Sequence, residues 1–365
     1  MTRSTLATCA WLCALALLAG CTSDSSTTGG SSAGGALKRI MVLTNGPGSY
    51  WDACREGVNA ADKELKLADH GLRAVLEIGD GTPKGQIDKL RQYASQADVA
   101  AVGISVTDAS NVAIAEELRK LRAKGVHVLA LDADVDREKF RDARLAFIGT
   151  DNLAAGRELG KAIAGLRPDG GGLVTFVGRT GSQNAIERRQ GVIEGAGAKF
   201  KALDNMADET DRSRAKDNVR NAITNHKDLN VLVGIWSYNG PAIVDVVQEL
   251  NRRKDFTCVT FDAEQKTIAA MDAGAVDCMI VQNPFKIGFD GVKMMAALLT
   301  NDEATQKAMF PDLKAAGGDL YDTGLKLVVP GEQSPLKAEQ FSNKTEFLTL
   351  EQFKAWLAKY KLKES

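Results

Sequence analysis

The sequence lacks the charge imbalance, metal-binding patterns and enzyme motifs that mark several large classes of protein. Its 46 Lys and Arg residues are matched by 47 Asp and Glu residues, which gives a formal net charge of −1. Proteins that bind the phosphates of nucleic acids usually carry a clear excess of Lys and Arg over Asp and Glu. The balance therefore argues against a nucleic-acid partner.

Metal-binding patterns and membrane spans are missing as well. The three histidines, His70, His127 and His226, are far apart in the sequence, and the cysteines show no spacing typical of a metal site. Beyond residue 36, no segment is apolar over the roughly 20 residues that a spanning helix needs. We therefore expect no metal, no cofactor and no later transmembrane helix.

Motifs of common enzymes are also absent. The sequence contains neither a phosphate-binding loop with its lysine nor a Gly-x-Ser-x-Gly elbow. Gly46-Pro47-Gly48 hints at a dinucleotide-binding loop, but the bulky Trp51 stands where the third glycine would be. We expect no catalytic residues, and an enzyme is a less favoured alternative.

The N-terminal region predicts export and lipid anchoring. Arg3 precedes an apolar run from Leu6 to Ala19, so residues 1–20 are typical of a signal peptide. The end of this segment, Leu18-Ala19-Gly20-Cys21, resembles the bacterial lipobox, in which the cysteine carries a lipid. Residues 21–36 continue as a flexible linker rich in Ser, Thr and Gly. We expect a lipoprotein of the cell envelope, anchored through Cys21 at the periplasmic or extracellular face of a membrane.

Three cysteines remain after the lipidated one. Cys258 and Cys278 lie in two consecutive predicted strands, and Cys54 stands apart from them. A disulfide between Cys258 and Cys278 is compatible with an extracytoplasmic compartment. Buried free thiols are the favoured interpretation.

Short apolar runs alternate with amphipathic segments along the rest of the chain. The runs are rich in Val, Ile and Leu and show little alternation, which is typical of parallel strands covered on both faces. Repeated strand–helix units of this length predict an α/β fold with parallel sheets and right-handed crossovers. The predicted strands are Ile40–Thr44, Ala74–Ile78, Val99–Ile104, Val126–Leu131, Leu145–Gly149, Leu173–Val177, Val231–Ile235, Cys258–Phe261, Val276–Val281 and Leu325–Val329.

Polar and aromatic residues gather where the predicted strands end. Ligands of open parallel sheets bind beyond the carboxyl ends of the strands. At these ends the sequence places Thr44–Trp51, Ser105, Asp132–Asp134, Trp236–Asn239, Asp262 and Gln282–Phe285. Aromatic faces pack on the C–H face of a sugar ring, whereas carboxylates and amides bond its hydroxyl groups. The pattern predicts a sugar site.

Several sequence blocks, taken in order, resemble the sugar-binding components of ATP-driven (ABC) importers, of the ribose- and galactose-binding type. The resemblance implies the type I periplasmic binding protein fold, with two Rossmann-like parallel-sheet lobes joined by a three-crossover hinge. Each block is weak alone, but their order and spacing are specific. The blocks are Thr44–Gly57, Ile104–Asp108, Leu129–Asp132, Ile148–Asn152, Glu187–Gly191, Val259–Asp262 and Ile280–Gln282.

The resemblance also implies a division of the chain. Residues 37–145 and 283–319 would form the N-terminal lobe, and residues 146–282 and 320–330 the C-terminal lobe. Residues 331–365 would be an extension, in which Thr349-Leu350-Glu351-Gln352 resembles a capping box that opens a helix. We expect this helix to pack on the body of the protein.

The family pattern implies ligand-binding roles for particular residues. Tyr50 and Trp51 would stack on the sugar ring. Asp132 would accept hydrogen bonds from hydroxyl groups, and Arg188 would donate a fork of them. Asp262 and Gln282 would bind hydroxyl groups from the other lobe. The complete predicted set is Asn45, Tyr50, Trp51, Ser105, Asp132, Asp134, Arg188, Trp236, Asn239, Asp262 and Gln282.

Departures from the family pattern bear on the choice of sugar. Ser105 stands where an Asn is usual, Ala133 where an Arg is usual, and Trp236 near another Asn position. Such changes alter pocket shape and hydrogen-bond donors, so we expect a pentose, a hexose or a related polyol rather than ribose itself. The expected partner of this monomer is an ABC permease. A lipoprotein sensor that signals to a membrane receptor is the alternative, because its binding chemistry would be identical.

Overall fold

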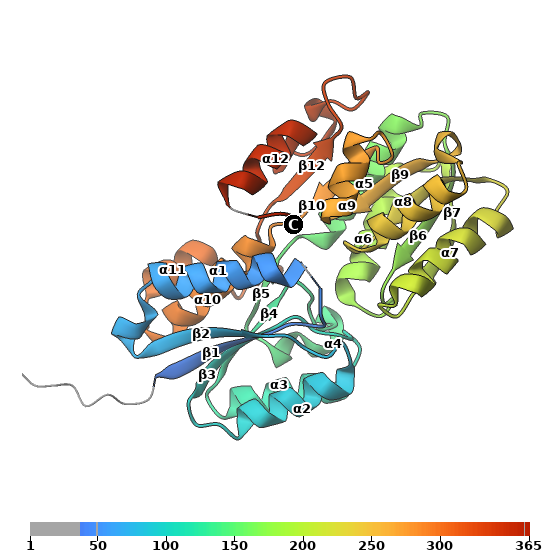
Figure 1. The fold of residues 1–365 in the computed structure, drawn as a ribbon. Helices are drawn as coiled ribbons and strands as arrows, with labels where there is room; N and C mark the ends of the chain where they lie inside the picture. Colours follow the sequence, from blue (N-terminus) through green and yellow to red (C-terminus); the bar gives the residue numbers. More distant parts are fainter. Residues whose placement is uncertain (1–36, 49, 361) are drawn as a thin grey trace, which may run out of the picture. The chain divides into compact units, whose positions relative to one another are not determined.

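The described part of the chain forms two β-sheets flanked by helices (Figure 1). The computed structural model describes residues 37–48, 50–360 and 362–365. The predicted signal peptide, Cys21 and the linker lie outside these residues. No helix within the described ranges is long and apolar enough to cross a membrane.

The first sheet has six strands, all parallel, in the order β11-β5-β4-β3-β1-β2. Its strands are β1 (Lys38–Leu43), β2 (Leu72–Glu77), β3 (Val99–Ile104), β4 (His127–Leu131), β5 (Ala146–Gly149) and β11 (Leu320–Asp322). Its helices are α1 (Tyr50–Glu64), α2 (Pro83–Ala94), α3 (Val112–Ala123), α4 (Arg137–Phe140), α10 (Pro284–Leu299) and α11 (Glu303–Met309). We call this sheet with its helices lobe one.

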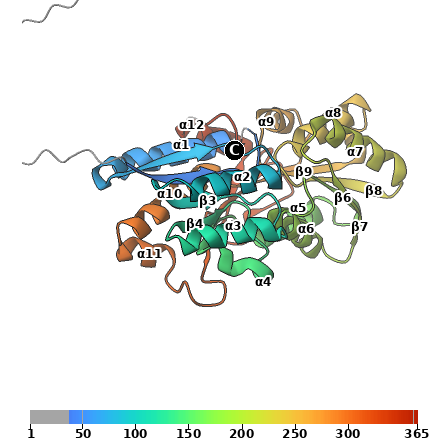
Figure 2. The same cartoon turned by 90° about the horizontal axis from the view of Figure 1, so that it is seen from below.

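Both faces of the lobe-one sheet are covered. Ile40 and Val42 pack in one apolar cluster with α1, α10 and α11, whereas Met41 and Leu43 pack in another with α2, α3 and α4. Figure 1 shows α1 and α10 on one side of the sheet and α2 and α3 on the other, and Figure 2 shows α2 and α3 side by side. Successive strand residues point to opposite faces, so double coverage requires continuous apolar runs.

The second sheet has seven strands in the order β13-β12-β10-β9-β8-β6-β7, and only the β10–β12 pair is antiparallel. Its strands are β6 (Gly171–Val177), β7 (Phe200–Ala207), β8 (Leu229–Gly234), β9 (Thr257–Phe261), β10 (Cys278–Val281), β12 (Leu325–Val329) and β13 (Thr345–Thr349). Its helices are α5 (Asn152–Leu166), α6 (Gln183–Ala196), α7 (Arg212–Asn225), α8 (Asn239–Glu249), α9 (Gln265–Asp272) and α12 (Leu350–Lys359). α5 and α6 pack in one apolar cluster, and α7, α8, α9 and α12 pack in two others. We call this sheet with its helices lobe two.

The α/β fold with two parallel-sheet lobes is confirmed, and all ten predicted strands occur. Two short strands nevertheless place the lobe boundaries differently. Ala146–Gly149 pairs with β4, and Leu320–Asp322 pairs with Ala146–Gly149, so both lie in the sheet of lobe one. The sequence predicts both segments in the C-terminal lobe. Strands of three or four residues carry too little pattern to show which sheet they join.

The predicted extension is part of lobe two. Thr345–Thr349 pairs in parallel with β12, so this segment adds an edge strand to the sheet. The predicted capping box opens α12: Gln352 N–H donates to Thr349 Oγ1, and Thr349 N–H donates to Gln352 Oε1. Leu350, Phe353 and Leu357 are buried against α8, α9, β10 and β12, as expected for a helix packed on the body.

The thiols of Cys258 and Cys278 are free and buried. Cys278 is in register with Val259 on the neighbouring strand, so Cys258 is offset by one residue. The two side chains belong to apolar clusters on opposite faces of the sheet. A disulfide between them would require both thiols on one face of the sheet. The interpretation of Cys258 and Cys278 as buried free thiols is therefore confirmed.

Candidate ligand-binding site

A cavity of about 340 Å³ lies at the carboxyl ends of the strands and is lined by residues of both lobes. Within the described residues, no group of three or more His, Cys, Asp and Glu side chains could hold a metal ion. Carboxylates, guanidinium groups, amides and aromatic rings line the cavity, which suits a small polar ligand with apolar faces. The lining includes these predicted residues: Asn45, Tyr50, Trp51, Asp132, Arg188, Trp236, Asp262 and Gln282.

Asp132 follows β4 and contributes its carboxylate to the cavity from lobe one. The Tyr50 hydroxyl donates to Oδ1 at 2.9 Å, and the Ser105 hydroxyl donates to Oδ2 at 3.0 Å. Burial raises the pKa of Asp132, and the Arg188 guanidinium opposes this shift. Ser105 does not line the cavity; it is 1% exposed and orients Asp132 from behind.

Asp262 occupies the corresponding position after β9 in lobe two. Gln282 Nε2 donates to its two carboxylate oxygens at 3.0 and 3.1 Å. Burial raises the pKa of Asp262 to about 6, while the Arg188 charge opposes the shift. Gln282 Oε1 is buried without a hydrogen-bond partner, so it can accept from a ligand hydroxyl.

Arg188 on α6 is 1% exposed, its Nη1 lies 3.8 Å from an Asp262 oxygen, and its charge opposes the rise in pKa of both Asp132 and Asp262. Nε donates to Asn152 Oδ1 at 2.9 Å, and Nη1 donates to the Ile235 carbonyl at 3.0 Å. Nη2 is buried without a partner. A Cβ at Gly156 would lie 2.3 Å from the Arg188 carbonyl oxygen, so the glycine lets α5 pack close enough to α6 for this contact.

Aromatic rings line the cavity from both lobes. Tyr50 and Trp51 begin α1, and their ring centroids lie 5.1 Å apart in an edge-to-face arrangement. Trp236 and Tyr238 follow β8, with centroids 6.5 Å apart. Trp236 Nε1 donates to Asn184 Oδ1 at 3.3 Å, which fixes the indole beside the cavity. Rings on both sides can pack on the apolar faces of a cyclic ligand.

Asn239, predicted to bind the ligand, does not line the cavity. It is fully buried at the start of α8. Its Oδ1 accepts from the Trp236 N–H at 3.0 Å, and its Nδ2 donates to Asp208 Oδ2 at 2.9 Å. The Tyr238 hydroxyl donates to the other oxygen of Asp208. Asn239 therefore fixes the loop that carries the aromatic residues, because the helix turns its side chain inward.

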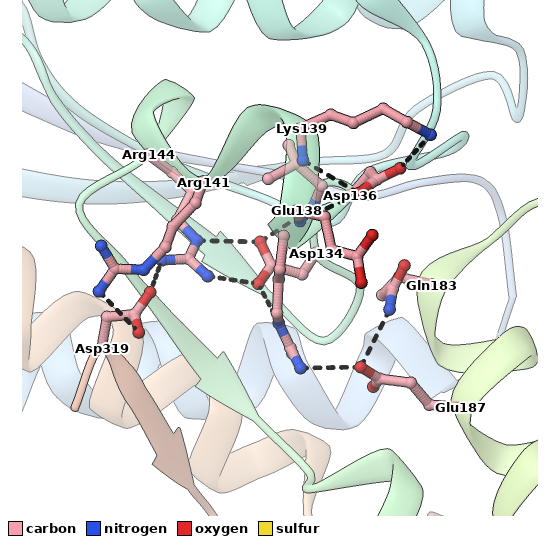
Figure 3. Close-up of polar contacts among 11 residues, drawn as sticks. Asp134, Asp136, Glu138, Lys139, Arg141, Arg144, Gln183, Glu187 and Asp319 are labelled. Carbon is pink, nitrogen blue, oxygen red and sulfur yellow. Dashed lines mark hydrogen bonds and ion pairs between the residues drawn. The ribbon is translucent and has the colours of Figure 1, made fainter. Parts of the chain in front are cut away.

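Asp134, also predicted to bind the ligand, lies instead in a buried ion-pair network (Figure 3). Arg144 donates to its two carboxylate oxygens at 3.0 and 2.6 Å, and Arg137 Nε donates at 2.8 Å. Arg144 also pairs with Asp319, which precedes β11. The turn after Asp132 points Asp134 away from the cavity, so this carboxylate ties the loop to the sheet.

A side chain of the same network connects the two lobes. Arg137 Nη1 on α4 lies 2.8 Å from Glu187 Oε1 on α6. Gln183 Nε2 donates to the same oxygen at 3.0 Å (Figure 3). Burial raises the pKa of Glu187, and the Arg137 charge opposes the shift. The pair therefore links the lobes beside the cavity.

Several lining residues were not predicted from the sequence. Arg212 donates to both oxygens of Glu264 at 3.0 and 2.8 Å, and Arg179 Nε lies 3.8 Å from a Glu209 oxygen. Five further lining residues lie within strand-end segments that the sequence marks, namely Gly46, Pro47, Gly48, Ser237 and Tyr238. The others reach the cavity from loops and helix starts, and no local pattern shows where these point.

Comparisons with known proteins agree with this geometry. The model of the periplasmic binding protein domain family matches residues 40–303. The D-allose-binding periplasmic protein of Escherichia coli is 21% identical over 272 residues, which cover 73% of this chain and 85% of that protein. The ribose import binding protein of the same organism is 25% identical over 198 residues, or 53% of this chain and 62% of that protein.

Solved structures share the fold. An ABC transporter solute-binding protein from Burkholderia graminis, in complex with D-arabinose, superposes with a TM-score of 0.68 at 19% identity. The match covers 81% of this chain and 96% of that one. Since the family model spans well over half of the sequence, the chain belongs to the periplasmic binding protein domain family.

Proposed function

We propose that the protein is an extracytoplasmic solute-binding component that captures a monosaccharide and delivers it to an ABC permease. One observation carries the choice of ligand: Arg188 Nη2 and Gln282 Oε1 are buried without partners in a cavity that also contains Asp132 and Asp262. A donor and acceptors at one site match neighbouring hydroxyl groups of a pentose, hexose or related polyol. The rings of Tyr50 and Trp236 add faces for the apolar side of the sugar.

The relatives support this class of ligand. Their names specify D-allose, ribose and D-arabinose, which are all neutral monosaccharides. They are binding and transport proteins rather than enzymes. The site here differs from the ribose-type pattern at Ser105 and Ala133, so we leave the identity of the sugar to experiment.

Capture would couple to movement of the lobes. Asp132 belongs to lobe one, whereas Arg188, Asp262 and Gln282 belong to lobe two. A sugar that bonds residues of both lobes binds the closed form more tightly, and so it shifts the population toward that form. A permease would then recognise the closed form.

The test is a thermal-shift screen followed by calorimetry. The probes are D-allose, D-ribose, D-arabinose and myo-inositol, with a disaccharide as the size control. At a concentration 100 times its Kd, a sugar stabilises the native state by about 2.7 kcal/mol and raises the melting temperature. If no monosaccharide or polyol raises it, the proposed ligand class is wrong.

Lipid anchoring through Cys21 is a further part of the proposal, supported by the lipobox-like sequence alone. The Cys21→Ser variant should lose lipid labelling and leave the membrane fraction for the soluble one. Cys54→Ser is the matched control, because that thiol is buried in the folded chain. Equal membrane retention of both variants would contradict the anchor.

A further inference from the structure

Residues 362–365 return from α12 to the strand ends that carry the binding site. The Ala263 N–H donates to the Ser365 carbonyl at 2.6 Å, and the Ser365 N–H donates to the Ala263 carbonyl at 3.2 Å. Ser365 Oγ donates to the Gln282 carbonyl at 3.1 Å. The Gln265 N–H donates to Glu364 Oε2 at 3.0 Å. One short segment therefore contacts both strand ends that place Asp262 and Gln282.

The segment is itself fixed in the fold. Ser365 is 3% exposed, and Leu362 packs on the apolar cluster beneath α12 while its N–H donates to the Leu357 carbonyl at 2.9 Å. The Tyr360 ring lies 5.8 Å from that of Phe285, in the first turn of α10 of lobe one. The segment thus lies beside the crossover that leaves Gln282 for lobe one.

Lobe one contains a similar backbone contact beside its own strand-end aspartate, Asp132. Asp132 has a φ of 64°, and Asp262 has a φ of 60°; both lie in the left-handed region, which side chains other than glycine adopt less readily. Such conformations persist only where neighbouring structure fixes them. After Asp132, the Ala133 carbonyl accepts from the Val106 N–H at 3.0 Å, from the end of the adjacent strand. After Asp262, Ser365 supplies the equivalent contact and adds a second hydrogen bond.

We propose that residues 362–365 are a positioning segment for the sugar site. The backbone pair with Ala263 holds Asp262 in its left-handed conformation, and the Ser365 hydroxyl holds the Gln282 backbone next to it. Asp262 therefore lies beside Arg188, and Gln282 stays hydrogen-bonded to Asp262, before a sugar arrives. The inference rests on the proposed function for its affinity readout, but its structural part can be tested without a ligand.

The experiment compares the native chain with deletion of residues 362–365, with Ser365→Ala and with Lys363→Ala. Lys363 is exposed and serves as the matched control. Calorimetry uses whichever of D-allose, D-ribose and D-arabinose binds the native chain most tightly. The deletion should weaken binding at least about tenfold, since it removes the hydrogen bonds to Ala263, Gln265 and Gln282 together. Ser365→Ala should weaken binding about two- to fivefold, and Lys363→Ala less than twofold.

Amide hydrogen exchange separates positioning from general destabilisation. In the sugar-free deletion variant, exchange at the Ala263 amide should rise, whereas exchange at the Val106 amide in lobe one should stay unchanged. Equal increases at both amides, or unchanged affinity and unchanged Ala263 exchange, would overturn the inference. If the deletion variant does not fold, Ser365→Ala decides by the same two readouts. If the native chain binds no sugar, the proposed function fails, and exchange alone decides this inference.

Discussion

Replacing Asp262 with Asn should make the sugar-free protein more stable at neutral pH while weakening its binding of sugar. Asp262 is 3% exposed and follows the apolar strand β9. Its carboxylate accepts from Gln282 and has Arg188 Nη1 at 3.8 Å, yet burial still raises its pKa to about 6. The ionised form is therefore disfavoured in the fold, and an Asn of the same shape removes that charge.

The sign and size of the effect follow from proton linkage. The pKa is raised from the ordinary value of 3.8, so the stability contributed by the neutral carboxyl is fully present below about pH 3.8 and is lost as the pH rises through about 6. At about 1.4 kcal/mol for each pH unit, the difference amounts to about 3 kcal/mol at pH 8. The D262N variant should exceed the native chain by this amount at pH 8 and by about half of it at pH 5.

Urea unfolding of the sugar-free protein at pH 5 and pH 8 measures both differences, and the melting temperature at pH 8 should rise by about 4 °C. Asp312→Asn, at an exposed carboxylate, is the matched control and should change stability little. Sugar affinity of D262N should fall about 10- to 100-fold, because a hydrogen bond to a charged acceptor contributes about 1.5–3 kcal/mol. The reasoning is refuted if D262N is no more stable than the native chain at pH 8, or if its advantage is the same at both pH values.

Other predictions concern the guanidinium, the contact between the lobes and the thiols. Arg188→Lys keeps the charge but loses the planar fork, so calorimetry should show at least about a 100-fold loss of sugar affinity; a loss below threefold would contradict the role given to Arg188. Glu187→Gln weakens the link to Arg137, so solution scattering should show a larger radius of gyration without sugar, and an unchanged radius would speak against the link. Burial raises the pKa of Cys258 to about 12 and also raises that of Cys278, so both thiols should react with a thiol reagent only after unfolding.

Most strands could be predicted from the sequence because both of their faces are covered, whereas β7, β11 and β13 could not be predicted. β1, for example, alternates between two apolar clusters, so every position from Ile40 to Leu43 must be apolar. The edge strand Phe200–Ala207 is only half-buried and includes Lys201, Asp204 and Asn205, so its pattern does not stand out. β11 has three residues, and its membership in lobe one depends on pairing with β5, which lies far away in the sequence.

The site could be predicted where a residue directly ends a buried strand. Asp132, Asp262 and Gln282 follow β4, β9 and β10, so the rule of the carboxyl edge placed them correctly beside the cavity. Asp134 lies only two residues further on, but the turn directs it into the ion pair with Arg144. The direction of a side chain after a turn depends on backbone angles, which residue types alone do not determine.

The two strand-end aspartates impose an electrostatic cost on the sugar-free site. Asp132 and Asp262 are both buried and both left-handed, and the single guanidinium of Arg188 lies near both. One cation cannot fully offset two buried carboxylates, which is why both pKa values are raised. Hydroxyl groups that donate to these carboxylates would stabilise the ionised forms and relieve part of this penalty. The burial that weakens the empty fold therefore contributes to the affinity of the occupied one.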